Sequence, residues 1–187
     1  KLVLGFMLTT AVLSMWISNT ATILMMLPMA IAIINAVDNP RFGVALILGI
    51  AYSASLGGVG TPIGTPPNII FMSVYEETQG IEYSFIDWMK TGVPIVILGV
   101  PIMALWLARG IKQVGNIDLP VPGTWTKAEK RVLAIFGTVA LAWIFRPFWT
   151  AWIGISTISD STIAVAGVAA MFFTNSGNDN GEVDEKG

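Results

Sequence analysis

The sequence contains no cysteine and no histidine, and only 12% of its 187 residues are charged. Without these two residue types there are no disulfides, no thiol chemistry, no zinc site of the Cys/His kind and no histidine proton relay. Ordinary soluble domains carry about 25% charged residues. The low charge therefore excludes a conventional soluble domain.

Apolar residues take the place of the missing charges. They form 54% of the chain, and the mean hydropathy is +0.71. The apolar runs do not alternate with polar residues as the strands of a membrane barrel do. We therefore predict an all-α integral membrane protein with the lipid bilayer as its surroundings.

The two ends of the sequence resemble interior positions. The chain begins at Lys1 without a signal-peptide pattern, and residues 175–187 are polar and acidic. We expect the chain to be an internal piece of a larger membrane protein, with 175–187 as a truncated polar loop.

The longest uncharged stretch, residues 2–37, has a polar cluster near its middle, Ser18-Asn19-Thr20. A straight helix of that length would measure about 54 Å, whereas the hydrocarbon core is about 30 Å thick. We predict a re-entrant helical hairpin over residues 1–38, with arms 2–17 and 21–37 and the polar cluster at its tip.

A second polar break interrupts the apolar stretch 42–75. Residues 57–68 contain four Gly and three Pro, which cannot continue a helix. We predict one transmembrane helix that is broken at mid-depth. Paired broken helices at corresponding positions indicate a transporter binding site.

Further apolar runs predict a helix over 91–108 and two more over 132–145 and 161–174. Residues 76–90 are polar, and 146–152 form an aromatic-rich interfacial turn. Asp160 is expected to cap the last helix. The cations favour one orientation, with Lys90 and Arg146 outside and seven inside before the tail: Lys1, Arg41, Arg109, Lys112, Lys127, Lys130 and Arg131.

The tip of the hairpin offers opposite helix ends to two ligands. The second arm would begin near Ala21, and its free N–H groups favour an anion. The first arm would end near Ile17, where free carbonyls and the hydroxyls of Ser14 and Ser18 suit Na⁺. A Ser-Asn-Thr cluster alone can also be a structural feature of a membrane helix, but here it accompanies a second break.

Residues Met15–Thr22 (MWISNTAT), followed by Met26-Leu27-Pro28, resemble the first Ser-Asn-Thr motif of the divalent anion/sodium symporters. Residues 49–61 (GIAYSASLGGVGT) and 64–68 (GTPPN) resemble that family's next signature. Ile158–Ala164 also fits a later segment of the family. The resemblance extends over essentially the whole chain.

The resemblance implies where ligands bind. A sodium site would lie near Ser14, Ser18, Asn19 and Gly64. A substrate carboxylate would meet Asn19, Thr20, Thr65 and Pro66, with Gly60 and Thr61 as less certain members.

The resemblance also implies an architecture, half of an inverted-repeat elevator-type transporter. Residues 1–108 would belong to the moving transport domain and 109–131 to a cytoplasmic connecting arm. Residues 132–174 would be scaffold helices that form a homodimer, and 175–187 a cytoplasmic loop. The second Ser-Asn-Thr hairpin of the family is not in this chain, so half of the site would come from elsewhere.

The function that follows is Na⁺-coupled symport of a dicarboxylate or tricarboxylate, such as succinate, malate, fumarate or citrate, across the inner (plasma) membrane. Na⁺ would be the coupling ion, with no other cofactor, no enzyme activity and no nucleic-acid partner. Alternatives are a Na⁺-independent exchanger of the same fold, a proton- or arsenite-linked transporter, and a non-functional fragment or membrane scaffold. A proton- or arsenite-linked transporter would need a buried carboxylate, and residues 2–37 and 42–75 contain none.

Overall fold

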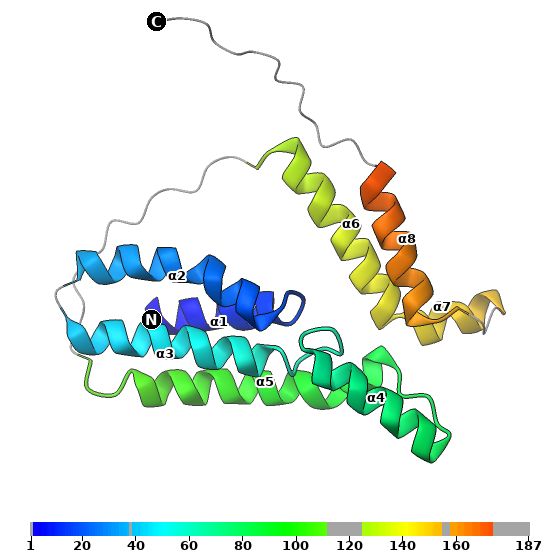
Figure 1. Cartoon of the computed structure of the whole chain (residues 1–187), viewed down its shortest axis with the longest axis horizontal. Helices are drawn as coiled ribbons and strands as arrows, with labels where there is room; N and C mark the ends of the chain where they lie inside the picture. The colour runs from blue at the N-terminus through cyan, green and yellow to red at the C-terminus, as the bar shows by residue number, and fades with distance from the viewer. Residues whose placement is uncertain (1, 38, 112–124, 155–157, 174–187) are drawn as a thin grey trace, which may run out of the picture. The chain divides into compact units, whose positions relative to one another are not determined.

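The computed structural model describes residues 2–37, 39–111, 125–154 and 158–173. Every regular element in these ranges is a helix, and they contain no strand, which confirms the predicted all-α class. The chain divides into two compact units, Lys1–Leu119 and Pro120–Gly187, and each is described by itself below. Figure 1 labels the helices of both units.

Three helices of the first unit are long and apolar enough to cross a membrane: α2 (Asn19–Ala36), α3 (Pro40–Gly57) and α5 (Phe85–Leu107). The same unit contains the shorter helices α1 (Leu2–Ser14) and α4 (Pro66–Gln79). In the second unit, α6 (Lys127–Ile144) and α7 (Arg146–Ile153) pass the same test as a bent pair. The chain is thus built for several crossings of a membrane, as its composition predicts.

The chain reverses direction between α1 and α2, as the hairpin prediction requires (Figure 1). The second arm, however, begins at Asn19 and not near Ala21, because the Ser18 hydroxyl caps the helix by accepting a hydrogen bond from the Ala21 N–H at 3.3 Å. The predicted tip residues Asn19 and Thr20 therefore lie in the first turn of α2. With 18 residues, α2 is also longer than the predicted arm.

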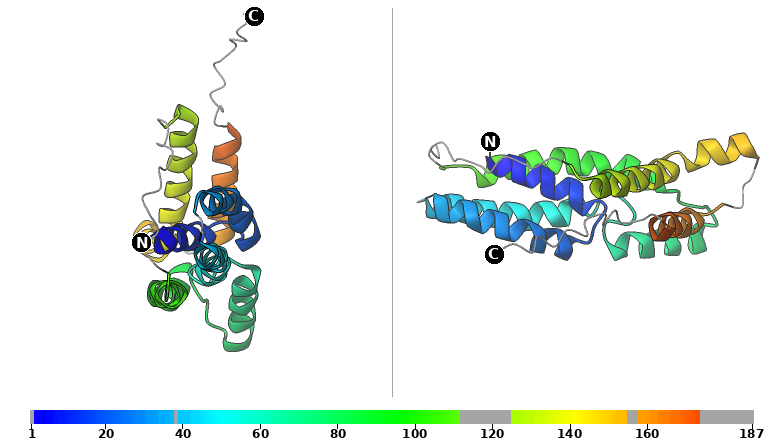
Figure 2. Two further views of the ribbon diagram at one scale, coloured as in Figure 1. Left: turned by 90° about the vertical axis from the view of Figure 1, so that its left-hand side faces the viewer. Right: turned by 90° about the horizontal axis from the view of Figure 1, so that it is seen from above.

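Helix α3 lies at the centre of the first unit and packs against α1, α2 and α5. Figure 2 (left) looks along the axes of α2, α3 and α5, which lie side by side. Buried apolar side chains from these helices form one core, for example Met7 of α1, Leu46 of α3 and Val100 of α5. Large side chains on the outer faces are exposed, as expected of helices that meet lipid.

The stretch predicted as a broken helix forms two helices, α3 and α4, joined by a non-helical loop over residues 58–65. That the two make one membrane crossing broken at mid-depth stays a prediction. Asn39 caps the start of α3, and Pro40 occupies its first turn. Helix α4 continues past the predicted end at Tyr75 to Gln79, where Gly80 adopts φ 66° and terminates it.

The predicted start of the next helix at residue 91 is wrong, because α5 begins at Phe85. The Ser84 hydroxyl accepts a hydrogen bond from the Asp87 N–H at 3.3 Å and caps the helix. Asp87 and Lys90 pair at 2.6 Å on its first turns. The helix therefore begins within the polar segment, whose low hydropathy predicts a non-helical connection.

The second unit contains two further corrections. Residues 146–152 form a short helix, α7, and not a turn; α7 is bent by 74° from α6 and ends where Gly154 adopts φ 77°. Helix α8 (Asp160–Phe173) begins at the predicted cap residue, and the Ser159 hydroxyl accepts from the Thr162 N–H at 3.4 Å instead. Asp160 pairs with the Nε of Arg146 at 2.9 Å.

Two predicted segments are only partly or not at all described. Residues 112–124, the larger part of the predicted connecting arm 109–131, lie outside the described residues, as does the predicted polar loop 175–187. The assignment of residues 1–108 to a transport domain and of 132–174 to a scaffold stays a prediction.

Candidate functional site

The end of α1 meets both the start of α2 and the end of α3 through one serine. The Ser14 side chain is fully buried, and its Oγ lies 2.6 Å from the Oδ1 of Asn19 and 2.7 Å from the carbonyl oxygen of Ala54. A serine hydroxyl has one proton and can donate it to one acceptor at a time. Three oxygens thus converge at this point, and the Ala54 carbonyl also accepts from the Gly58 N–H at 3.1 Å. A cluster of neutral oxygens of this kind suits a small cation.

The loop between α3 and α4 lies against this oxygen cluster. A methyl group built on Gly58 would lie 2.6 Å from the Oδ1 of Asn19, so the side chain of Asn19 rests on the backbone of Gly58. A methyl group built on Gly64 would lie 2.5 Å from the carbonyl oxygen of Gly58. Gly58 therefore joins Asn19 on one side to Gly64 on the other, and only glycine permits such close backbone contact.

A second contact joins the loop to the turn after α1. The buried hydroxyl of Thr61 donates a hydrogen bond to the carbonyl of Met15. Gly60 lies against the same residue, because a methyl group built there would be 2.8 Å from the Cε of Met15. The two polar breaks of the sequence are thus packed on each other in the folded unit.

Asn68 holds the loop in shape from the first turn of α4. Its Nδ2 donates to the carbonyl oxygens of Gly58 at 2.7 Å and Thr61 at 2.8 Å, and its side chain is buried. The carbonyls of Gly60, Pro62 and Gly64, all in buried residues, accept no hydrogen bond from the part of the chain that the structure describes. Because buried carbonyls are nearly always bonded, such free loop oxygens fit a bound cation.

The structure brings part of the predicted site together. Ser14 and Asn19 share a hydrogen bond, and Gly60, Thr61 and Gly64 lie in the loop that packs on them. The Ser18 side chain is exposed and serves as the cap of α2.

The predicted anion ligands lie at the ends of two helices. Thr20 is the second residue of α2, and Thr65 and Pro66 stand at the start of α4. The hydroxyls of Thr20 and Thr65 make no hydrogen bond within the described ranges, and Thr65 does not cap its helix. Both start points carry the partial positive charge of a helix N-terminus. The contact of Gly58 with Asn19 and Gly64 keeps them in one region of the unit.

Sequence reasoning missed two contributors to this region. The carbonyl of Ala54 has no side-chain signal, since any residue at that position would present the same oxygen. Asn68 ends the Thr-Pro-Pro-Asn segment, and its position in the first turn of a helix that follows a glycine-rich loop is a signal for a residue that bonds the loop.

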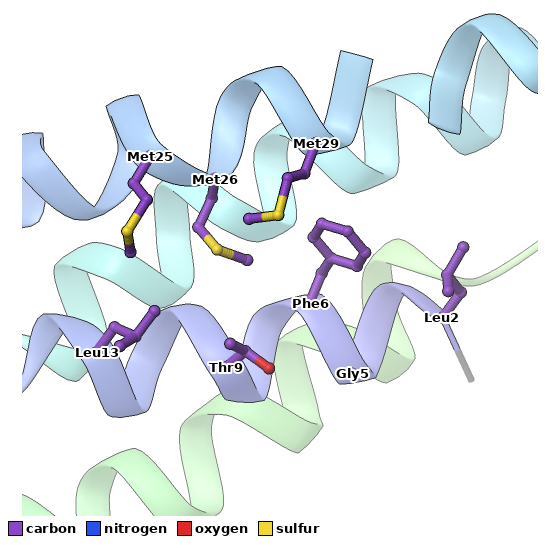
Figure 3. Close-up of a pocket in the computed structure, with 8 residues that line it drawn as sticks. All are labelled: Leu2, Gly5, Phe6, Thr9, Leu13, Met25, Met26 and Met29. Carbon is purple, nitrogen blue, oxygen red and sulfur yellow. The ribbon is translucent and has the colours of Figure 1, made fainter. Parts of the chain in front are cut away.

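An apolar groove lies elsewhere on the unit, between the two arms of the hairpin (Figure 3). Met25, Met26 and Met29 of α2 point into it toward α1, with Met29 above Phe6 and Met25 nearer Leu13. None of the predicted site residues lines this groove, which is also bounded by Leu2, Gly5, Thr9 and Leu13. It is therefore distinct from the polar region at the tip.

Comparison with known proteins gives two findings. A family model described as "Citrate transporter" matches residues 1–183. The chain is 36% identical over 188 aligned positions to proteins called sodium-dependent dicarboxylate transporter SdcS in Staphylococcus aureus strains USA300 and NCTC 8325. These alignments cover 88% of this chain and 36% of the relatives, so the chain spans about a third of the length of the curated relatives that it matches.

Proposed function

The chain belongs to the citrate transporter family, and from this membership we propose that it supplies one half of the binding site of a Na⁺-coupled carboxylate transporter. The observation that carries the proposal is the convergence of three oxygens at Ser14, whose hydroxyl lies 2.6 Å from the Oδ1 of Asn19 and 2.7 Å from the carbonyl oxygen of Ala54. The family match agrees with the resemblance inferred from the Ser-Asn-Thr and Gly-Thr-Pro-Pro-Asn motifs.

The cation would bind where α1 ends. Ser14 Oγ, Asn19 Oδ1 and the free carbonyl of Gly64 are neutral oxygen ligands, which together with unwound backbone form Na⁺ sites in broken membrane helices. The carbonyl of Ala54 lies within 2.7 Å of the same hydroxyl. Ser18 would contribute its carbonyl less directly, because that oxygen already accepts from the Thr22 N–H at 3.0 Å.

The anion would bind where α2 and α4 begin. A substrate carboxylate at Asn19, Thr20, Thr65 and Pro66 would face two helix N-termini and two hydroxyls that have no other partner in the described ranges. Residues 2–37 and 42–75 contain no Lys or Arg. The pull on the anion is therefore modest, which permits release on the other side of the membrane.

The transport cycle follows from the two ligands. Na⁺ would bind first, neutralise the carbonyl-rich end of α1 and fix Asn19, so that the anion meets preorganised donors. The substrates would be dicarboxylates or tricarboxylates such as succinate, malate, fumarate or citrate. Residues 1–108 would then move as a transport domain, in an elevator motion, against a scaffold of 132–174 that dimerises in the inner membrane.

Uptake of labelled succinate into proteoliposomes by the complete protein tests the proposal. We expect uptake with an inward Na⁺ gradient and at least tenfold less when choline replaces Na⁺. Asn19→Ala should abolish the Na⁺-driven component. Asn39→Ala is the matched control, since Asn39 is likewise an asparagine at the start of a helix, where its Oδ1 accepts from the Phe42 N–H at 3.2 Å, but it lies away from the loop.

Two results would contradict the proposal. Succinate uptake that is equal in Na⁺ and choline, and that needs a dicarboxylate inside the vesicle, would identify the Na⁺-independent exchanger. Uptake that Asn19→Ala and Asn39→Ala reduce equally would remove Asn19 from the site.

A further inference from the structure

The first two turns of α5 present one face to the candidate site. Phe85, Trp88 and Gly92 are spaced i, i+3 and i+7 and therefore share a side of the helix. Phe85 is 2% exposed, and its ring stacks on Trp16, in the turn after α1, with centroids 6.3 Å apart. The same face thus contacts the turn after α1 and, through the other two residues, the loop of the broken helix.

Trp88 bonds the loop backbone directly. Its indole Nε1 donates to the carbonyl oxygen of Val59 at 2.7 Å, across 29 positions of sequence. Gly92 lets the backbone of α5 approach the loop this closely, because a methyl group there would lie 3.1 Å from the carbonyl oxygen of Gly60 and closer still to that of Val59. The backbone of α5 and the backbone of the loop are therefore in contact at this point.

Side chains bond three carbonyls of the loop, and Trp88 bonds one of them. Asn68 occupies those of Gly58 and Thr61, and Trp88 occupies that of Val59, whereas the carbonyl of Gly64 has no donor among the described residues. If the Val59 carbonyl lost its donor, the loop would tend to rotate until that carbonyl met another donor, because an unpaired carbonyl is unfavourable. Rotation would move Gly58, on which Asn19 rests.

The ring of Trp88 is itself held by aromatic neighbours. It meets Phe71 edge-on at 5.7 Å and Tyr83 at 6.3 Å, and Tyr75 packs on both of these residues at 6.1 and 5.2 Å. Contacts of this kind fix the orientation of a ring as well as its position. The indole N–H is thereby aimed at the loop and is not free to turn to another acceptor.

We propose that Trp88 is a positioning residue for the ligand site, and that its indole N–H sets the conformation of the Gly58–Gly64 loop that contacts Asn19. The proposal rests on the proposed function, in that the ligands affected are Na⁺ and the carboxylate. It adds a residue outside both polar motifs, on a helix that contributes no ligand of its own.

The variant Trp88→Phe tests the proposal because it keeps an aromatic ring and removes the N–H. Its matched control is Trp149→Phe, since Trp149 also donates its Nε1 to a backbone carbonyl, that of Ala142 at 2.9 Å, within the second unit. Gly92→Ala is a second variant, whose added methyl group would collide with the same Val59 carbonyl. Trp88→Phe and Gly92→Ala should change the Na⁺ dependence of uptake and the exchange rate of the loop in the same direction.

We expect Trp88→Phe to raise the Na⁺ concentration for half-maximal succinate uptake about fivefold or more, with maximal uptake at saturating Na⁺ within about twofold of the parent. Trp149→Phe should leave the Na⁺ dependence unchanged. An equal Na⁺ dependence in the two variants, or a fall in maximal uptake alone, would overturn the proposal.

Hydrogen–deuterium exchange of residues 57–65, measured without substrate, separates this proposal from the transport function. Exchange should accelerate about fivefold or more in Trp88→Phe and not in Trp149→Phe. If the parent shows no Na⁺-driven uptake, the proposed function fails, and the exchange rates alone decide whether Trp88 holds the loop. Equal exchange in both variants would refute the role of Trp88, whatever the protein transports.

Discussion

The oxygen cluster around Ser14 makes a quantitative prediction for Ser14→Ala. The change removes one of three converging oxygens together with its hydroxyl proton, while Asn19 and the Ala54 carbonyl remain. A hydrogen bond or polar contact to a charged group contributes about 1.5–3 kcal/mol. Because each 1.4 kcal/mol is a factor of ten, the Na⁺ concentration for half-maximal uptake should rise about 10- to 150-fold.

The cost to the fold should be much smaller than the cost to Na⁺ binding. Ser14 donates one neutral hydrogen bond at a time, and such a bond contributes about 0.5–1.5 kcal/mol to stability. Ser53→Ala is the matched control, because Ser53 is equally buried and donates to the Gly49 carbonyl of its own helix at 2.5 Å. The two variants should have similar thermal unfolding midpoints and different Na⁺ dependence.

The assay is succinate uptake by proteoliposomes at a series of external Na⁺ concentrations. If Na⁺ and succinate are coupled, each changes the affinity of the other by the same factor. Ser14→Ala should therefore show a raised KM for succinate at low Na⁺, and a KM near that of the parent at saturating Na⁺. A Na⁺ dependence equal to that of Ser53→Ala would refute the reasoning, since the three oxygens would then bind no cation.

Two further predictions concern packing within each unit. Gly57→Ala should lower the free energy of unfolding by about 1–3 kcal/mol, because its methyl group would lie 2.7 Å from the Cα of Ala11. Gly137→Ala, whose methyl group would have nothing within 4 Å, should be neutral or stabilising. A thermal-shift assay measures both. Arg146→Gln should destabilise the protein by about 1–3 kcal/mol, less than for a fully buried pair because the Asp160 side chain is 33% exposed. Succinate affinity should not change in Arg146→Gln, and an unaltered unfolding midpoint would show that the ion pair contributes nothing.

Polar breaks were the most predictable feature of this chain. Ser18-Asn19-Thr20 interrupts an apolar run that is too long for one membrane helix, and the glycine-proline stretch interrupts a second run. The structure has a chain reversal at the first and a loop at the second. The physical reason is local: proline lacks a donor and glycine lacks helix propensity, whatever the remainder of the fold does.

Helix ends were predictable only where hydropathy and capping agree. Helix α5 starts six residues before the predicted position, at Phe85 instead of residue 91, because Ser84 caps it and Asp87 pairs with Lys90 on its surface. Helix α7 was missed because its aromatic residues and embedded Arg146 are typical of an interfacial turn. In both cases a short-range contact stabilises helix in residues whose hydropathy indicates a connection.

The tertiary contacts of the candidate site could not be predicted. The motif predicts Ser14, Asn19 and Gly64 as neighbours of a ligand, but the carbonyl of Ala54 is chemically identical to any other, and the bond from Trp88 to Val59 depends on how α5 packs. Such contacts follow from the register of one helix against another. A sequence without aligned relatives does not fix that register.

The absence of charge near the site explains why this register matters. Residues 2–37 and 42–75 contain no Asp, Glu, Lys or Arg, so the proposed attraction for Na⁺ and for a carboxylate would have to come from oriented hydroxyls, amides and helix ends. A full charge attracts a ligand over a wide range of positions, whereas a dipole does so only when it points at the ligand. Affinity in such a site is set by the packing that aims the dipoles. Residues such as Gly58, Asn68 and Trp88, which bind no ligand themselves, should therefore control Na⁺ affinity nearly as strongly as the ligand residues do.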